Sequence, residues 1–200
     1  MLAAARRPVF RVAPHPAPAA GAQDRDVLHR RLSLSEDLTH FSAEGRARMV
    51  DVSAKPATAR MAIASGVLRM QAATLARIHE GRVVKGNVLA VADVAAVMAA
   101  KRTPETIPMC HSLPLTGVEV AFTDVPADAD GQPGVRACVA VNCFGPTGVE
   151  MEALCAVSAA LLTIYDMCKA IDPEMRVEGI QLDEKHGGKH GVWRRSGGNA

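Results

Sequence analysis

The amino-acid sequence predicts an α+β protein with one antiparallel sheet and a layer of helices. Three observations lead to this fold class. Apolar and polar residues alternate at 118–123 and 135–141, which is typical of strands. Apolar residues recur at helical spacing, without interior Gly or Pro, at 71–80, 88–102 and 149–171. The chain has 200 residues and is 48% hydrophobic, so it can bury the core of one domain.

The first predicted strand covers residues 60–69. Ser65-Gly66 lies at its centre, and this pair is poor in a helix interior but acceptable in a strand with a close neighbour. A helix is predicted at 71–80, with Leu75 and Ile78 facing inward. The sequence therefore predicts a closely packed strand followed directly by a helix.

A second helix is predicted at 88–102, with Asn87 as its N-cap. Two strands at 118–123 and 135–141 then form a hairpin, because a polar link joins two alternating segments. The broad apolar side of the second helix is expected to contain Leu89, Val91, Ala95, Val97 and Met98.

A long, largely buried helix is predicted at 149–171, and a last strand at 175–182 precedes a loop around Gly187-Gly188. The order strand, two helices, two strands, helix and strand is the ferredoxin-like plan. We therefore expect a ferredoxin-like sandwich with a four-stranded antiparallel sheet, helices on one face and one extra helix. The apolar stripe of the long helix is expected to contain Leu154, Val157, Leu161, Ile164 and Cys168.

Composition excludes several classes of function. The net charge of +2 and the 3% aromatic content do not favour a nucleic-acid-binding protein. The five cysteines form no C-x-x-C pair, so free thiols are expected rather than disulfides or a zinc site. No metal-ligand cluster or Walker-type phosphate loop is present, and no apolar run reaches the length that predicts a membrane span.

The N-terminal part differs from the rest of the chain. Its first 23 residues contain Arg6, Arg7 and Arg11 but no acidic residue, and four prolines interrupt them. This composition fits either a mitochondrial transit peptide or a disordered extension. We expect a leader at 1–34, a single domain at 35–195 and a disordered tail at 196–200, with the mitochondrial matrix as location and the cytoplasm as alternative.

The long helix carries charges at both ends. Glu150 and Glu152 lie in its first turn, and Asp166 and Lys169 lie three residues apart near its end. At about 1.5 Å per residue, Glu150 and Asp166 are about 24 Å apart, so they cannot contact one small ligand within one subunit. The acidic pair could also serve only the helix dipole, and the second pair could be an ordinary surface ion pair.

Basic residues cluster outside the helix interiors and could line a pocket for a polyanion or simply be solvated. They are Lys55, Lys85, Lys101, Arg102, Lys185 and Lys189.

Six segments resemble the cyclic pyranopterin monophosphate synthase family of molybdenum cofactor biosynthesis. They are MVDVSAK at 49–55, AAKRT at 99–103, IPMCH at 107–111, TGVEMEA at 147–153, TIYDMCKA at 163–170 and KHGG at 185–188. The resemblance covers residues 38–194. Met109 stands where Leu is common, and His186 and His190 replace small polar residues.

The resemblance implies a lyase that converts 3′,8-cyclo-7,8-dihydroguanosine 5′-triphosphate to cyclic pyranopterin monophosphate and diphosphate. It implies no cofactor, although Mg²⁺ could accompany the triphosphate. It also implies a homohexamer, built as a trimer of dimers, with sites at subunit interfaces. The implied catalytic residues are Asp166, Lys169 and His111. The implied substrate-binding residues are Lys55, Arg60, Lys85, Met109, Cys110, His111, Glu150, Met151, Glu152 and Lys185, with Lys169 contacting substrate as well.

Reaction chemistry suggests how these residues divide the work. Asp166 and Lys169 suit proton transfer, Glu150 and Glu152 suit the guanine-derived ring, and His111 suits positioning or proton transfer. Lys85, Lys185 and Arg60 suit the phosphates. A non-catalytic nucleotide-sensing module is the alternative, because fold does not determine function.

Overall fold

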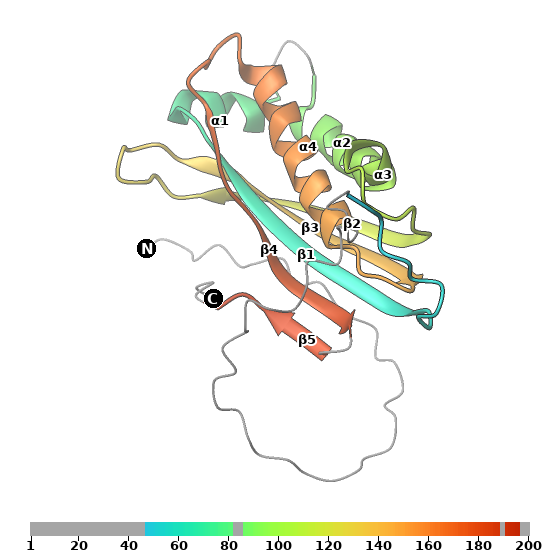
Figure 1. Cartoon of the computed structure of the whole chain (residues 1–200). Coiled ribbons are helices and arrows are strands. Elements are labelled where there is room, and N and C mark those ends of the chain that lie inside the picture. The colour runs from blue at the N-terminus through green and yellow to red at the C-terminus, as the bar shows by residue number, and fades with distance from the viewer. Residues whose placement is uncertain (1–46, 82–85, 189–190, 197–200) are drawn as a thin grey trace.

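The computed structural model describes residues 47–81, 86–188 and 191–196 (Figure 1). Five antiparallel strands form one sheet in the order β2-β3-β1-β4-β5. The strands are β1 (Thr58–Arg69), β2 (Leu115–Val125), β3 (Gly134–Gly145), β4 (Arg176–Gly188) and β5 (Gly191–Arg194). The helices are α1 (Ala72–His79), α2 (Val88–Lys101), α3 (Thr103–Thr106) and α4 (Glu150–Cys168). The α+β class is therefore confirmed.

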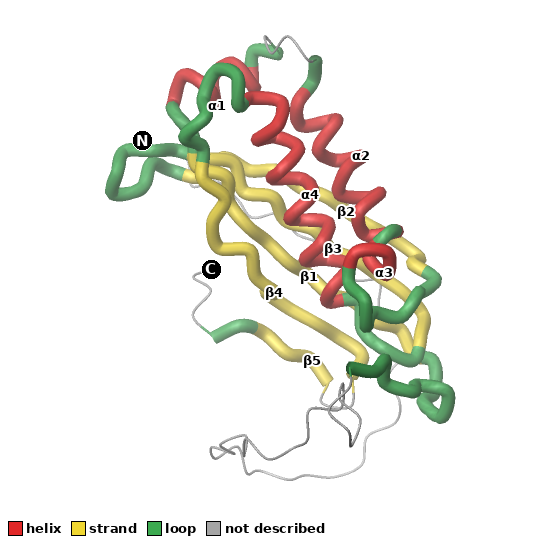
Figure 2. The backbone as a smooth tube through the Cα atoms, turned by 45° about the horizontal axis from the view of Figure 1, so that its top comes forward, coloured by secondary structure: helices red, strands yellow, loops and turns green. Residues whose placement is uncertain are grey.

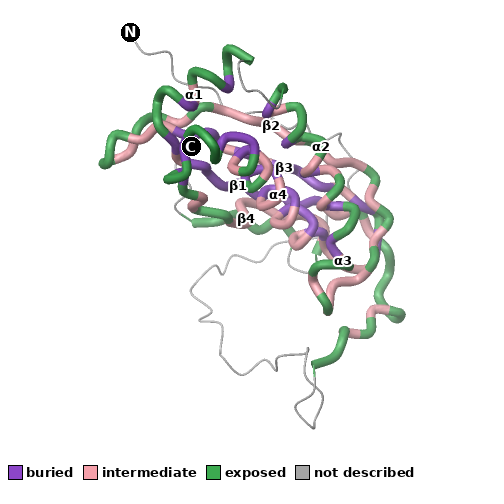
Figure 3. Tube along the Cα trace, turned by 90° about the horizontal axis from the view of Figure 1, so that it is seen from above, coloured by how far each residue is buried: buried purple, intermediate pink, exposed green. Residues whose placement is uncertain are grey.

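Strand β1 lies at the centre of the sheet and pairs with β3 along its whole length, from Thr58 opposite Gly145 to Arg69 opposite Gly134. Its residues alternate between the two faces of the sheet. Ala62, Ala64 and Leu68 are fully buried on the face that α2 and α4 cover (Figures 1 and 2). Buried residues accordingly concentrate in β1, in β3 and in the side of α4 that packs on these two strands (Figure 3).

Helix α4 packs directly against Gly66 of β1, as expected for a strand glycine with a close neighbour. A Cβ atom at Gly66 would lie 2.9 Å from Leu161 Cδ1 and 3.1 Å from Val157 Cγ1. Of the predicted α4 stripe, Val157, Leu161, Ile164 and Cys168 are buried, whereas Leu154 is only half-buried. The absence of a side chain at position 66 therefore brings the helix close to the sheet.

The predicted apolar side of α2 is wrong for Val91 and Met98, whereas Leu89 packs against the core as expected. The buried residues are Val88, Ala92, Ala96 and Ala100, while Val91 and Met98 are exposed. Helix α2 packs beside α4 (Figure 2), and α4 presents small buried residues such as Ala153 and Ala160. Small side chains allow the two backbones to approach closely, so Ala92, Ala96 and Ala100 face the core together with Val88, and Leu89 packs at its margin. Asn87 caps α2 as predicted, because its Oδ1 accepts from Ala90 N at 3.1 Å.

The four-strand count and the terminal loop are also wrong. Strand β4 continues through Gly188 and pairs with β5, with Glu184 opposite Arg194 and Lys185 opposite Trp193. Lys185 thus lies on a strand. Gly191, at φ 69°, adopts the left-handed conformation that glycine tolerates between these strands.

Helix α1 receives its N-terminal cap from another part of the chain. Gln71 forms no side-chain cap, and the buried carboxylate of Asp172 accepts hydrogen bonds from Gln71 N at 2.8 Å and Thr74 Oγ1 at 3.0 Å. Asp172 thus satisfies the N–H of the residue before the helix and a hydroxyl of its first turn. Asp172 therefore joins the start of α1 to the segment that follows α4.

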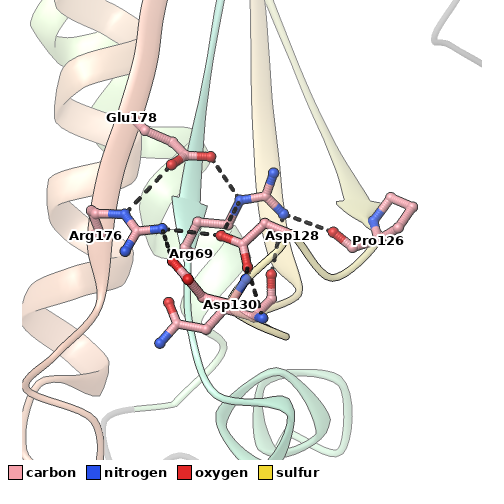
Figure 4. A network of polar contacts seen from close by, with 7 residues as sticks. Arg69, Pro126, Asp128, Asp130, Arg176 and Glu178 are labelled. Carbon is pink, nitrogen blue, oxygen red and sulfur yellow. Dashed lines mark hydrogen bonds and ion pairs between the residues drawn. The ribbon is translucent and has the colours of Figure 1, made fainter.

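The end of the sheet opposite the α4 N-terminus carries a network of charged residues (Figure 4). Arg69 Nε lies 2.7 Å from Glu178 Oε1, and Arg176 Nη2 lies 3.0 Å from Asp128 Oδ2. The hydrogen bond from Gln132 N is the main cause of a lowered pKa at Asp128. The network ties β1 and β4 to the link between β2 and β3.

Helix α4 is, among the described residues, long and apolar enough to cross a membrane by length and composition. Half of its most apolar window is buried within the protein. A core helix that packs on a sheet has the same composition, and we interpret α4 as such a helix.

Candidate functional site

A pocket of about 560 Å³ lies at the N-terminus of α4. Three segments that are distant in sequence form it: 50–55, 107–111 and 147–152. The lining residues are Val50, Val52, Lys55, Ile107, Met109, Cys110, His111, Thr147, Gly148, Glu150, Met151 and Glu152. Seven of the predicted site residues thus come together in one cavity, whose size is typical of small-molecule sites.

Glu152 is the buried charged group of this pocket, with 2% of its surface exposed. Its Oε1 lies 3.4 Å from Cys110 Sγ, and its Oε2 has no hydrogen-bond partner. Burial raises the pKa of the Glu152 carboxyl, and the nearby Glu150 adds to this effect. An unsatisfied buried acceptor is costly, so this oxygen is suited to accept a hydrogen bond from a ligand.

Glu150 faces a cation from the sheet. Its Oε1 lies 3.1 Å from Lys185 Nζ, which reaches over from β4. The neighbouring Arg60 donates from Nε to Gly145 O and from Nη2 to Pro146 O, both at 3.4 Å. Arg60 therefore holds the turn that leads into α4, and Lys185 neutralises the first acidic residue of the helix.

His111 is oriented by the backbone of the segment 50–55. Its Nε2 lies 2.8 Å from Val50 O, and a carbonyl only accepts, so Nε2 carries a proton. In the neutral ring, Nδ1 then has the free lone pair. His111 can accept a proton or a hydrogen bond through Nδ1.

Cys110 is not poised as a nucleophile. Burial, followed by the proximity of Glu152, raises its pKa to about 12. Because the thiolate is the reactive form, this thiol is inert at neutral pH.

Asp166 and Lys169 lie at the other end of α4, outside the pocket. Lys169 Nζ is 2.6 Å from Asp166 Oδ1, and their side chains are 54% and 58% exposed. The hydrogen bond to Asp166 raises the pKa of Lys169. The spacing along the helix keeps this pair about 24 Å from Glu150 within one chain.

Lys85, a predicted substrate-binding residue, and His190, a departure from the family pattern, lie outside the described part of the chain. His186 on β4 pairs instead with Glu184, which also binds Arg194. Sequence reasoning missed the pocket residues Val52, Ile107 and Thr147, because an apolar or small side chain carries no chemical signal of its own. Their positions inside the resembling segments were the one available signal. Within the described ranges, no group of three His, Cys, Asp or Glu side chains could hold a metal ion.

Comparisons with known proteins agree on one family. The MoaC family model matches residues 49–188, which include all the predicted site residues. The cyclic pyranopterin monophosphate synthase of Limosilactobacillus fermentum is 56% identical over 158 residues, which cover 79% of this chain and 93% of that protein. The enzyme of the same name from Desulfitobacterium hafniense is 57% identical over 159 residues, which cover 80% and 94%. That of Brevibacillus brevis is 52% identical over 162 residues, which cover 81% and 98%.

Proposed function

The chain belongs to the MoaC family, and from this premise we propose that it is a cyclic pyranopterin monophosphate synthase of molybdenum cofactor biosynthesis. Its substrate is 3′,8-cyclo-7,8-dihydroguanosine 5′-triphosphate. The purine and ribose rearrange to the pyranopterin, a ribose-derived oxygen attacks the α-phosphorus, and diphosphate leaves.

The observation that carries this proposal is the buried, unpartnered Oε2 of Glu152, a residue that lines the pocket. A guanine-derived ring presents N–H donors along one edge, and a buried carboxylate oxygen is a matching acceptor. Glu150 lies at the same helix start. We assign both carboxylates to the ring, with Met109, Cys110 and Met151 around it and His111 offering Nδ1 as acceptor.

The Asp166–Lys169 pair supports general acid–base catalysis. It places an ammonium group, a possible proton donor, 2.6 Å from a carboxylate, a possible proton acceptor. Because this pair lies about 24 Å from Glu150 along α4, a complete site requires two subunits. We therefore propose a homo-oligomer with shared sites, arranged as a hexameric trimer of dimers.

Basic residues near the pocket suit the triphosphate. Lys55 lines the cavity and Lys185 stands at its edge, bound to Glu150. A phosphate group can compete for Lys185, and Arg60 has N–H groups beyond the two that hold the turn. We add Lys85 by resemblance, and Mg²⁺ would enter as the companion of the triphosphate.

The relatives named above are bacterial, and bacteria contain no mitochondria. This supports the cytoplasmic location over the mitochondrial matrix. We also assign β1 to β4 to the ferredoxin-like plan, because their order β2-β3-β1-β4 and the helix layer fit that plan, with β5 as an addition.

Turnover tests the proposal directly. The purified chain is incubated with the cyclic nucleotide, diphosphate is measured in a coupled assay, and the product is identified by mass spectrometry. We expect stoichiometric diphosphate and cyclic pyranopterin monophosphate. Binding of the nucleotide without diphosphate release would instead identify a sensing module.

A further inference from the structure

The half-buried thiol of Cys110 and the buried carboxyl of Glu152 form a pair that joins two elements. Cys110 lies in the turn after α3, where its backbone N donates to Ile107 O at 3.0 Å. Its Sγ lies 3.4 Å from Glu152 Oε1 in the first turn of α4. The backbone turn fixes the position of Cys110, and its thiol then restricts rotation of the Glu152 carboxyl group.

The direction of this hydrogen bond is defined by the protonation of the thiol. Cys110 S–H donates and Glu152 Oε1 accepts, in agreement with a Cys110 pKa raised to about 12. Oε1 is thereby engaged, and the buried Oε2 of this pocket-lining residue is left without a hydrogen-bond partner.

Two other thiols lie near the same carboxyl group but make different contacts. Glu152 contributes electrostatically to the raised pKa values of Cys143 and Cys155. Cys143 Sγ approaches Thr147 O at 3.9 Å, and Cys155 is hydrogen-bonded to Thr103. Among the hydrogen bonds of the described residues, the thiol contact of Glu152 is that with Cys110.

We propose that Cys110 is a positioning residue that orients Glu152, so that Oε2 reads the amino-bearing edge of a guanine-type ring. Cys110 then determines base specificity without itself reacting. The inference rests on the proposed function, because it takes the pocket to hold the ring of the substrate.

The proposal predicts discrimination between guanine and hypoxanthine, which lacks the exocyclic amino group. Binding of GTP and of ITP is measured by calorimetry on the full chain, both as unreactive stand-ins for the cyclic nucleotide. We expect the parent protein to prefer GTP by roughly tenfold or more, the size of a hydrogen bond to a charged group. Cys110→Ala should reduce this ratio to near one, because the carboxyl group is no longer oriented.

Matched variants separate orientation from general damage. Cys110→Ser restores a donor and should retain the preference for GTP, and Cys155→Ala removes a neighbouring thiol and should also retain it. Glu152→Gln should abolish the preference, because an amide N–H₂ can take the place of Oε2. With the cyclic substrate, Cys110→Ala should raise KM while kcat changes only a few-fold.

Two results would overturn the proposal: no measurable preference in the parent protein, or an unchanged ratio in folded Cys110→Ala. If Cys110→Ala does not fold, loss of the preference in Cys110→Ser or its persistence in Glu152→Gln overturns it as well. If the parent protein turns over the cyclic nucleotide but Cys110→Ala keeps the parent GTP/ITP affinity ratio, this inference is rejected and the proposed function stands. Absence of turnover in the parent rejects the proposed function.

Discussion

Among single residues, Glu152 couples the pocket to the stability of the fold. Burial raises its pKa above the ordinary 4.5, so the native state holds this proton more tightly than the unfolded state does. Its contribution to stability is therefore complete below about pH 4.5 and is lost as pH rises through the raised value. Glu152→Gln cannot titrate.

We therefore expect the unfolding free energy of Glu152→Gln to improve relative to the parent as pH rises from 4.5 to 8. Urea titrations of both proteins across this range give the difference at each pH. A difference that stays constant, or that shrinks with rising pH, would contradict the raised pKa.

Cys110 should resist alkylation even though it lines a pocket. A rise in pKa from 9.0 to about 12 lowers the thiolate fraction near pH 8 by about 10³-fold. Iodoacetamide labelling followed by mass spectrometry should show Cys110 unmodified in the native protein and modified in urea. Labelling at the rate of the urea-unfolded chain would show that the thiol is ionised.

Asp166→Asn and Lys169→Ala should each lower turnover by at least ~10²-fold, the low end for general acid–base groups. Their exposed ion pair contributes little to stability, so the unfolding free energy should hardly change. Steady-state kinetics and urea unfolding test both parts. Near-normal turnover in both variants would remove this pair from proton transfer.

At the level of helices and strands, the elements with long uninterrupted periodicity could be predicted from sequence. The helix α4 and the β2–β3 hairpin are examples. The inward side of α2 could not be predicted, because apolar residues occur all around it and packing against α4 selects the smallest ones. The strand β5 could not be predicted either, because its four exposed residues owe their conformation to pairing with β4.

The contact between α4 and β1 predicts that Gly66→Ala is destabilising. The new Cβ would press on Leu161 and Val157 in a filled core, at a cost of about 1–3 kcal/mol. Gly117→Ala is the matched control, because its Cβ would lie 3.6 Å from the nearest atom, an ordinary contact. Thermal unfolding should therefore separate the two variants. Equal melting temperatures would mean that the packing of α4 on β1 does not require a glycine at position 66.

Considered as a whole, the molecule places the predicted site residues Glu150 and Asp166 near opposite ends of one helix. Local patterns could identify the charges of α4 and the distance between Glu150 and Asp166. They could not reveal that the segments 50–55, 107–111 and 147–152 meet, because hydrophobic periodicity reports local structure and not contacts between distant segments. Resemblance to a family supplied those residues. The predicted role of Lys85 stays a prediction, since Lys85 lies outside the described residues.

We propose that each site combines the α4 N-terminus of one subunit with the α4 C-terminus of another. Mixing two inactive variants, Glu150→Gln and Asp166→Asn, tests this arrangement. In a site shared across a two-fold interface, a mixed dimer has one doubly altered site and one intact site.

The two variants are refolded together at equal amounts, mixed oligomers are verified by mass, and diphosphate release is measured. We expect activity up to roughly a quarter of the parent value, because half of randomly paired dimers are mixed and each has one intact site of two. Each variant refolded alone should stay inactive. Verified mixed oligomers without any recovered activity would contradict a site that is shared between subunits.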